Sequence, residues 1–458
     1  MRDNSHLVQT NLQVNNASRS IRNLLHRSSL IVVLALALTG LGAALTGILF
    51  KAGVYQLDEW RLALLKDISP WLVLPTLGGL GGWISGYLIT KLSPEASGSG
   101  VTHIMAFLRH RAVPMGLRVG LVKLLTGIIA IGSGFPLGPE GPAVQMGGSV
   151  AWKMAQMLKA PTAFRRVIVA AGGGAGLAAI FSAPIGGFIY AIEELLNSAR
   201  PVVLLLVVVT TFWADTWADV LQAIGLDPSA GGFDSNLGFQ VQREYTPSIE
   251  FLPIDLGYLI ILGIIVGCIA ELYCQYVLKM QQVGKRWFGK QLILKMSVCG
   301  VVLGVIYASL PREFHHITGL QKLIAEESID ISMAFTIFIV VFITTGLAAA
   351  SGAPGGLFYP MLILGGSLGL VCDHWAIAIT EYVPNTYVFA GMGAFVSACS
   401  RTPITAMFLA FALTKNLLIL KPLLIACITS FLVSRLFNEH SIYERQIDLD
   451  LEKKPTLL

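Results

Sequence analysis

Charged residues are scarce in this sequence. Asp, Glu, Lys and Arg together make up 13% of its 458 residues, whereas hydrophobic residues make up 54%, and the mean hydropathy is +0.70. A soluble domain carries about a quarter charged residues. The chain therefore has too little charge to cover a globule exposed to water. Its formal net charge of +5 fits basic loops beside a membrane better than a nucleic-acid-binding surface.

The sequence also lacks the residue groupings that mark many enzymes and metal proteins. Its six cysteines stand singly, without a Cys-x-x-Cys pair, and free cysteine behaves as a small hydrophobic residue. Adjacent Glu193 and Glu194 could suggest a catalytic carboxylate pair, but no P-loop and no cluster of metal-ligand histidines accompanies them. We therefore expect no enzyme activity, no metal and no cofactor. We expect His315 and His316, in a polar connection, to be solvated.

Long uncharged runs decide the class of protein. Residues 29–50 and 167–192 carry no charge, and residues 333–372 form an uncharged stretch of 40 residues. A membrane-spanning helix needs about 20 apolar residues, and no alternating pattern indicates a membrane β-barrel. The sequence predicts an all-α polytopic membrane protein. Its embedded segments are expected at about 29–64, 69–92, 116–133, 141–157, 162–182, 184–195, 200–224, 252–282, 291–310, 332–351, 357–380, 386–400, 404–415 and 420–437.

Charge asymmetry between the connections predicts the orientation. The first 28 residues hold four arginines against a single aspartate, so this segment is expected to be cytoplasmic. Lysines and an arginine between 279 and 295 mark another cytoplasmic connection, whereas 227–250 and 312–330 are more acidic and are expected to be external. Short tails without a targeting signal favour a prokaryotic inner membrane.

Two broken stretches of the chain match each other. Ser133-Gly-Phe-Pro-Leu-Gly-Pro-Glu-Gly-Pro142 aligns at an offset of 218 with Ser351-Gly-Ala-Pro-Gly-Gly-Leu-Phe-Tyr-Pro360, and Gly147-Gly-Ser149 matches Gly365-Gly-Ser367 at the same offset. Interrupted apolar segments at corresponding positions of two halves point to a transporter site near the membrane midplane. We divide the chain into a cytoplasmic segment 1–28, a first repeat 29–224, an external linker 225–250, a second repeat 251–443 and a cytoplasmic tail 444–458.

The broken stretches have the chemistry of an anion site. A non-helical turn at membrane depth leaves backbone N–H groups that hydrocarbon cannot satisfy, and a helix N-terminus adds about half a positive charge. Partial charges suit transport, because conduction needs binding weak enough for the ion to leave.

Glu140 lies within the first stretch, where an ionised carboxylate would compete with a transported anion for the same donors. A gating role is favoured over the alternative, a carboxylate that only caps its helix, because charged groups in a membrane are costly.

Four other charged residues keep alternative interpretations. Glu193 and Glu194 end an apolar run and could be an interfacial, solvated pair. Adjacent carboxylates on a helix point about 100° apart, so they need not share one function. Lys123 and Arg401, alone in apolar segments, are expected to satisfy helix-end carbonyls. Lys123 keeps the alternative of attracting anions.

The motifs resemble those of the CLC family of chloride channels and proton-coupled chloride exchangers. Gly98-Ser-Gly-Val-Thr102 is similar to the family's first anion motif, usually Gly-Ser-Gly-Ile-Pro. Gly138-Pro-Glu-Gly-Pro142 and Gly356-Leu-Phe-Tyr-Pro360 resemble its Gly-(Arg/Lys)-Glu-Gly-Pro and Gly-x-Phe-x-Pro motifs. Ser441-Ile-Tyr-Glu444 fits the motif that carries a pore tyrosine. The resemblance covers about residues 30–443.

This resemblance implies a fold of two inverted-topology repeats with many tilted and partial helices, and a homodimer with one pore in each subunit. It implies that Ser99, Tyr443 and the backbone N–H groups of Leu357 and Phe358 hold a chloride ion. Glu140 would be the external gate, Glu194 the internal proton-transfer group, and Glu193 would help to admit protons from the cytoplasm. Supporting glycines are expected at Gly98, Gly100, Gly138, Gly141 and Gly356.

Two departures from the family's motifs stand out. Pro139 replaces the usual basic residue beside the gate, which removes a charge and a donor, although proline is tolerated in a first helical turn. Thr102 replaces a proline, and we expect it to affect the start of its helix more than selectivity. Only 15 residues follow Tyr443, so no pair of CBS domains is expected. The resulting hypothesis is an antiporter that exchanges chloride for protons, and the alternative is a passive chloride channel of the same fold.

Overall fold

The computed structural model describes residues 29–111, 113–197, 200–226, 253–316, 319–325, 329–380 and 386–451. The predicted segment 1–28, nearly all of the predicted linker 225–250 and the end of the predicted tail lie outside these residues. Helices make up the described regular structure, together with one isolated bridge between Gly138 and Gly356. Seven of the described helices are long and apolar enough to cross a membrane, which confirms the predicted polytopic class.

The first half of the chain forms helices of very different lengths. They are α2 (Ser29–Asp67), α3 (Pro70–Leu92), η1 (Pro94–Ala96), α4 (Gly100–Leu108), α5 (Leu117–Gly132), α6 (Glu140–Met157), α7 (Thr162–Phe181), α8 (Pro184–Tyr190), the π-helical turn η2 (Ala191–Leu196) and α9 (Pro201–Ala223). Prolines at 70, 184 and 201 stand in the first turn of their helices, where their missing N–H costs nothing.

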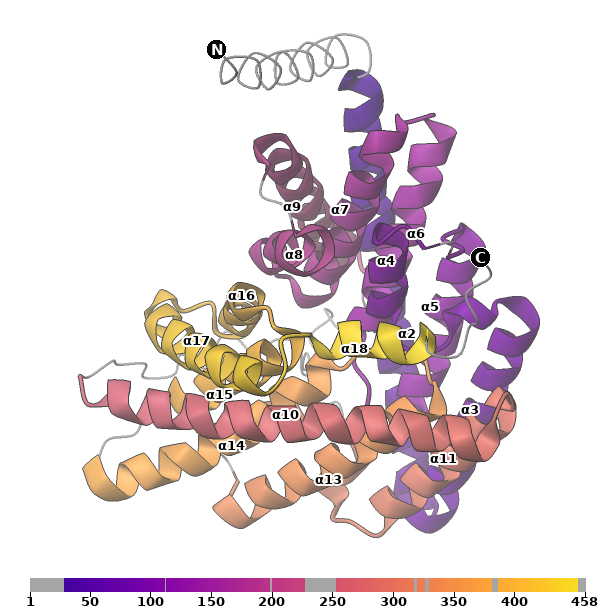
Figure 1. Ribbon diagram of the computed structural model, residues 1–458. Helices are drawn as coiled ribbons and strands as arrows, with labels where there is room; N and C mark the ends of the chain where they lie inside the picture. Colours follow the sequence, from indigo (N-terminus) through magenta and orange to yellow (C-terminus); the bar gives the residue numbers. More distant parts are fainter. Residues whose placement is uncertain are drawn as a thin grey trace.

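The second half repeats this order. It contains α10 (Asp255–Phe288), α11 (Leu292–Ala308), η4 (Arg312–His315), α12 (Leu320–Ala325), α13 (Ile331–Ser351), α14 (Phe358–Thr380), α15 (Thr386–Ser400), α16 (Pro403–Thr414), η6 (Leu417–Ile419), α17 (Leu420–Phe437) and α18 (Ile442–Leu451). In Figure 1 most of the indigo-to-magenta first half lies above the red-to-yellow second half, while α3 packs against α11 at the lower right.

Close glycine contacts recur at equivalent positions of the two halves. A Cβ atom on Gly147 of α6 would overlap the carbonyl of Gly172 on α7, and a Cβ on Gly365 of α14 would overlap the carbonyl of Gly391 on α15. Small residues let helix backbones approach in this way. The shared contact supports the internal repeat predicted from the offset of the two broken stretches.

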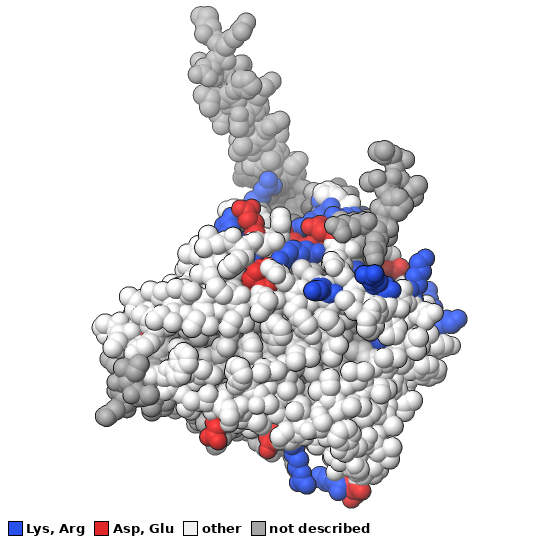
Figure 2. Space-filling view, turned by 60° about the horizontal axis from the view of Figure 1, so that its bottom comes forward, with Lys and Arg blue, Asp and Glu red and all other residues white. Residues whose placement is uncertain are grey.

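The outer surface of the molecule is apolar around its middle. Figure 2 shows acidic and basic side chains at the two ends of the molecule, with a wide band between them that carries almost none. Many large apolar side chains are exposed, among them Leu205 (63%), Leu272 (61%) and Leu436 (86%). Such a surface is unfavourable in water and matches the hydrocarbon of a bilayer.

Candidate anion and proton site

The two broken stretches meet inside the molecule. Gly138 and Gly356 form an antiparallel bridge, in which the Gly138 N–H donates to the Gly356 carbonyl at 2.9 Å and the Gly356 N–H donates to the Gly138 carbonyl at 2.7 Å. Each non-helical turn thus satisfies part of the other's backbone, which hydrocarbon could not do. Two residues later α6 begins at Glu140 and α14 begins at Phe358, so two helix N-termini converge on one point.

The Glu140 carboxylate accepts a hydrogen bond from a backbone N–H group of the second broken stretch. Its side chain is fully buried, and its Oε1 accepts the Phe358 N–H at 2.5 Å. Its Oε2 is buried and has no hydrogen-bond partner among the described residues. The resemblance assigns the Phe358 N–H to the transported anion, and the structure shows the Glu140 carboxylate on that same donor. The predicted competition between Glu140 and an anion therefore concerns the Phe358 N–H.

Two of the predicted supporting glycines, Gly138 and Gly356, make room for this carboxylate, and a third, Gly141, lets the backbones of the two stretches approach. A Cβ atom on Gly138 or on Gly356 would overlap the Glu140 carboxylate, and a Cβ on Gly141 would lie 3.0 Å from the Gly356 nitrogen. A larger residue at Gly138 or Gly356 would push the carboxylate away from Phe358, and one at Gly141 would press on the backbone of the second stretch.

Two hydroxyl groups lie next to this junction without partners. Ser99 immediately precedes α4, and Tyr443 is the second residue of α18. Both hydroxyl oxygens are buried and accept or donate no hydrogen bond among the described residues. The Tyr443 ring packs edge-to-face on Phe358 with ring centroids 5.8 Å apart. A buried hydroxyl without a partner costs about 1–3 kcal/mol, so these two groups, with buried Leu357 and Phe358, suit a polar ligand such as an anion.

Lys123 supports the loop that carries Ser99. Its side chain is fully buried, and its Nζ donates to the carbonyls of Ala96 at 2.9 Å and Gly98 at 2.5 Å. The expectation that Lys123 satisfies helix-end carbonyls is therefore confirmed. Gly98 has a positive φ of 66°, which favours glycine, and its N–H donates to the Gly352 carbonyl at 2.9 Å. The segment Gly98–Thr102 is thus hydrogen-bonded to the turn that precedes the motif Gly356–Pro360.

The two departures from the family's motifs, Thr102 and Pro139, fit at the starts of their helices. The Thr102 hydroxyl donates to the Ser99 carbonyl at 2.7 Å within the first turn of α4, so it acts at the start of the helix. Gly100 packs so closely that a Cβ would overlap the Gly141 carbonyl. Pro139 directly precedes α6, and its carbonyl accepts the Ala143 N–H at 2.9 Å.

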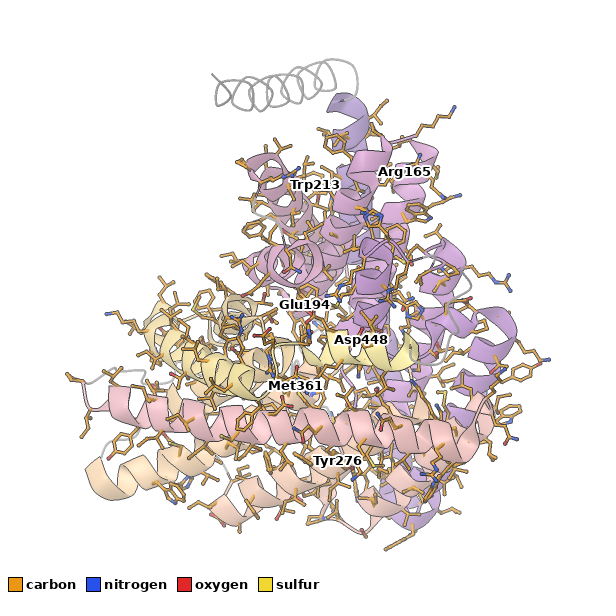
Figure 3. All side chains as sticks on the ribbon, in the orientation of Figure 1. Arg165, Glu194, Trp213, Tyr276, Met361 and Asp448 are labelled. Atoms are coloured by element: carbon orange, nitrogen blue, oxygen red, sulfur yellow. The ribbon has the colours of Figure 1, made fainter. Side chains whose placement is uncertain are left out.

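Glu193 and Glu194 point to different elements. Glu194 lies in η2, in the middle of the molecule (Figure 3), where it is buried and its Oε1 accepts the Ser441 hydroxyl at 3.4 Å. Glu193 caps the N-terminus of α16: its Oε2 accepts the N–H and the hydroxyl of Thr405 at 2.8 and 2.7 Å, and its Oε1 accepts the Ile404 N–H at 3.3 Å. The expected divergence of the two carboxylates is confirmed, and the capping function of Glu193 is one that sequence reasoning missed.

An ionic cluster holds the helix that carries Tyr443. Glu271 of α10 accepts hydrogen bonds from Arg445 of α18 at 2.7 and 3.3 Å and from Arg401 at 3.0 Å. Arg401 also donates to the carbonyl of Asn438, as its predicted role with helix-end carbonyls requires. Removing one partner of a buried ion pair costs about 3–5 kcal/mol, so this cluster fixes α18 firmly.

The start of α18 is a capping box that also contacts Glu194. The Ser441 N–H donates to Glu444 Oε2 at 3.0 Å, and the Glu444 N–H donates to the Ser441 hydroxyl at 3.2 Å. Glu444 in turn pairs with Arg109, the residue that directly follows α4. The Ser-x-x-Glu spacing of a capping box is readable from sequence, whereas the pairing with Arg109, 335 residues away, is not.

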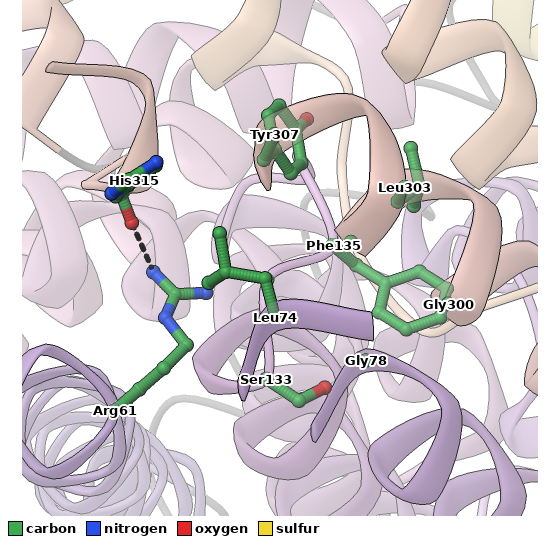
Figure 4. Close-up of a pocket in the computed structure, with 11 residues that line it drawn as sticks. Arg61, Leu74, Gly78, Ser133, Phe135, Gly300, Leu303, Tyr307 and His315 are labelled. Carbon is green, nitrogen blue, oxygen red and sulfur yellow. Dashed lines mark hydrogen bonds between the residues drawn. The ribbon is translucent and has the colours of Figure 1, made fainter. Parts of the chain in front are cut away.

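A second polar cluster lies against the turn of the first broken stretch. Arg61 of α2 pairs with Asp58 and donates to the His315 carbonyl at 3.0 Å. A cavity of about 10 Å³ separates Arg61 from Ser133 and the start of that turn (Figure 4). His315 is only 8% exposed, so the expectation of a solvated histidine was wrong for it, because η4 folds back over α2. Burial and the nearby Arg61 charge lower the pKa of His315.

Comparison with known proteins identifies the family. The family model described as "Voltage gated chloride channel" matches residues 81–435, well over half of the chain. The chain belongs to the voltage-gated chloride channel family. The "H(+)/Cl(-) exchange transporter ClcA" of Cronobacter sakazakii is 30% identical over 455 residues, which cover 95% of this chain and 93% of the relative. The protein of the same description from Citrobacter koseri is 29% identical over 454 residues, with 95% and 92% covered.

Solved structures of the voltage-gated chloride channel family share the fold. A slow cyanobacterial Cl-/H+ antiporter has a TM-score of 0.81 and 26% sequence identity, covering 93% of this chain and 99% of its own. A eukaryotic CLC transporter has a TM-score of 0.77 at 22% identity, covering 92% of this chain and 74% of its own; at that identity the likeness concerns the fold alone. The predicted arrangement of two matched halves with partial helices is confirmed.

Proposed function

We propose that this protein is a secondary antiporter that exchanges chloride for protons across a membrane. One observation carries the proposal: the Glu140 carboxylate accepts the Phe358 N–H at 2.5 Å, a donor that also suits chloride. The relatives described as H(+)/Cl(-) exchange transporters support the same activity. A carboxylate and an anion that share one donor exclude each other, and this exclusion couples the two ions.

On the anion side, the site offers partial charges rather than a formal cation. Ser99 and Tyr443 contribute hydroxyl groups, and Leu357 and Phe358 contribute backbone N–H groups at the N-terminus of α14. Such donors replace part of the hydration shell of chloride and still release the ion. The buried Lys123 ammonium, one residue from Ser99 through its bond to Gly98, donates instead to the Ala96 and Gly98 carbonyls. It therefore positions the loop and leaves the ion to weaker donors.

On the proton side, Glu140 takes up a proton, leaves the Phe358 N–H and frees this donor for chloride. A neutral carboxyl group accepts a hydrogen bond less strongly than a carboxylate does, since charge-assisted hydrogen bonds are about twice as strong. Glu194 exchanges the proton on the cytoplasmic side, with Ser441 as its hydrogen-bond donor. Glu193 remains the proposed aid to proton admission, in addition to its cap on α16.

The test is simultaneous measurement of chloride and proton movement from liposomes that contain the purified protein. A chloride gradient should drive protons uphill, and the current should respond to voltage because both ions move charge, each worth about 2.3 kcal/mol per 100 mV. The competing function is a passive chloride channel of the same fold. Chloride flux without proton movement would establish the channel and refute the exchanger.

We further propose that the protein is a homodimer in a prokaryotic inner membrane with its N-terminus in the cytoplasm. The family resemblance supports the dimer, and the arginines of residues 1–28 support the orientation. Single-molecule photobleaching in liposomes would count subunits. Labelling of a cysteine introduced near the N-terminus, in inside-out and right-side-out vesicles, would give the orientation.

A further inference from the structure

Tyr190 carries a buried hydroxyl group that the functions above do not use. It ends α8, its side chain is fully buried, and its hydroxyl has no hydrogen-bond partner among the described residues. The same holds for Ser99 Oγ, Tyr443 Oη and Glu140 Oε2. Three of these four oxygens have a proposed role with chloride or with the gate. A phenylalanine at position 190 would fill the same space without the cost of an unpaired hydroxyl. This cost suggests that the hydroxyl has a function.

Tyr190 is close in the chain to one of the two proposed proton-carrying carboxylates and packs on the residue that holds the other. It stands four residues before Glu194, one helical turn away on the same helix face, and the π-helical turn η2 (Ala191–Leu196) follows it directly. π-Helical turns often occur at functional sites. The Tyr190 ring packs edge-to-face on Phe358 with centroids 5.8 Å apart, and the Phe358 N–H holds Glu140.

The Phe358 ring separates Tyr190 from the pore tyrosine. Tyr443 packs edge-to-face on the same ring, also at 5.8 Å, so the two tyrosines flank Phe358. Tyr443 belongs with Ser99 on the anion path, in a separate motif on α18. Tyr190 is on the chain segment that carries Glu194. Its hydroxyl could therefore carry a proton part of the way from Glu194 to Glu140.

We propose that the Tyr190 hydroxyl relays the proton between Glu194 and Glu140. This proposal rests on the proposed function, in which these two residues carry the proton. In the inward-to-outward direction, the carboxyl proton of Glu194 reaches the Tyr190 oxygen and the hydroxyl's own proton reaches a carboxylate oxygen of Glu140. Each transfer passes through one intervening water, which accepts one proton and releases another, because the hydroxyl has no direct partner among the described residues. The O–H bonds of Glu194 and Tyr190 break and one O–H bond forms on Tyr190 and one on Glu140. Tyrosine remains neutral, and rotation about its C–O bond restores the starting orientation.

The test is Tyr190→Phe, which removes one oxygen atom and keeps the ring that packs on Phe358. Chloride and proton fluxes are measured together from liposomes with an imposed chloride gradient. We expect proton flux to fall about tenfold or more, as for loss of a positioned proton-transfer group, and chloride flux to stay within about twofold of the wild-type value. The number of chloride ions moved per proton therefore rises. This ratio would not change if Tyr190 only packed against its neighbours.

Tyr307→Phe is the matched control. Tyr307 is another buried tyrosine whose hydroxyl has no hydrogen-bond partner among the described residues, but it lies on α11 beside Arg61 and His315. Its variant should keep both fluxes. A Tyr190→Phe protein with the wild-type ratio of chloride to protons would overturn the relay, and so would an equal loss of both fluxes. Absence of proton movement in the wild-type protein would instead refute the exchanger itself, so the two failures are distinguishable.

Discussion

Replacing Glu140 with glutamine tests the central contact of the proposed mechanism. The Glu140 carboxylate accepts the Phe358 N–H at 2.5 Å inside the protein. Glutamine keeps the size of the side chain and retains an oxygen that can accept this hydrogen bond, but it carries no charge and cannot take up a proton. Exchange should therefore become chloride flux alone, with proton flux abolished.

The structure also sets the size of the change in chloride affinity. A hydrogen bond to a charged group contributes about 1.5–3 kcal/mol, whereas a neutral one contributes about 1 kcal/mol. The hydrogen bond between the side chain and the Phe358 N–H thus becomes weaker by about 0.5–2 kcal/mol. Because 1.4 kcal/mol corresponds to a tenfold change in binding, chloride should bind the Glu140→Gln protein roughly tenfold more tightly.

Isothermal titration with chloride in detergent measures the affinity, and paired flux recordings from liposomes measure the coupling. Glu439→Gln, which neutralises an exposed glutamate after α17, is the control and should leave both properties unchanged. Unaltered chloride affinity together with persistent proton transport in Glu140→Gln would refute the competition between the carboxylate and the anion.

Three further substitutions probe other parts of the mechanism and the fold. Glu194→Ala should abolish proton flux and leave chloride binding nearly unchanged in titration calorimetry, since its contact with Ser441 lies apart from the proposed anion donors; lost chloride binding would contradict its assignment. Lys123→Met removes two buried charge-assisted hydrogen bonds, so chloride should bind at least about tenfold more weakly, at about 1.5–3 kcal/mol for each bond lost; equal affinity would show that the Ser99 loop needs no ammonium. Gly300→Ala places a Cβ against the Gly78 carbonyl and should destabilise the protein by about 1–3 kcal/mol in thermal unfolding. Gly257→Ala, with no atom within 4 Å of its Cβ, should not, and equal melting temperatures would contradict the close α3–α11 contact.

Much of the site could be predicted because its chemistry is local to short motifs. The residues between Gly138 and Pro142 place a carboxylate at the first turn of a helix, and those between Gly356 and Pro360 place unpaired N–H groups at another. The helices begin at Glu140 and Phe358 in the structure, at equivalent positions of the two stretches. Gly and Pro end and start helices through backbone geometry alone. The helix starts can therefore be predicted from the sequence without knowledge of tertiary contacts.

Contacts between distant segments could not be predicted in the same way. Glu193 shows the limit: its sequence neighbourhood indicates only an apolar helix end, but the fold brings Ile404 and Thr405 to it, and the carboxylate becomes the cap of α16. The buried His315 is a second case, because a polar connection is exposed unless another element covers it. Pairings such as Arg109 with Glu444 depend on side chains from opposite ends of the chain.

By itself the sequence determined the membrane class, the two matched halves and the residue types that can bind an anion or carry a proton, because these follow from hydrophobic length, backbone geometry and charge. Only the tertiary structure decided which of those groups meet. It placed the Glu140 carboxylate on the Phe358 N–H, and it placed the Tyr190 ring against the same phenylalanine. Both contacts join residues far apart in the chain, and their geometry arises only when two helix N-termini pack together within one buried junction.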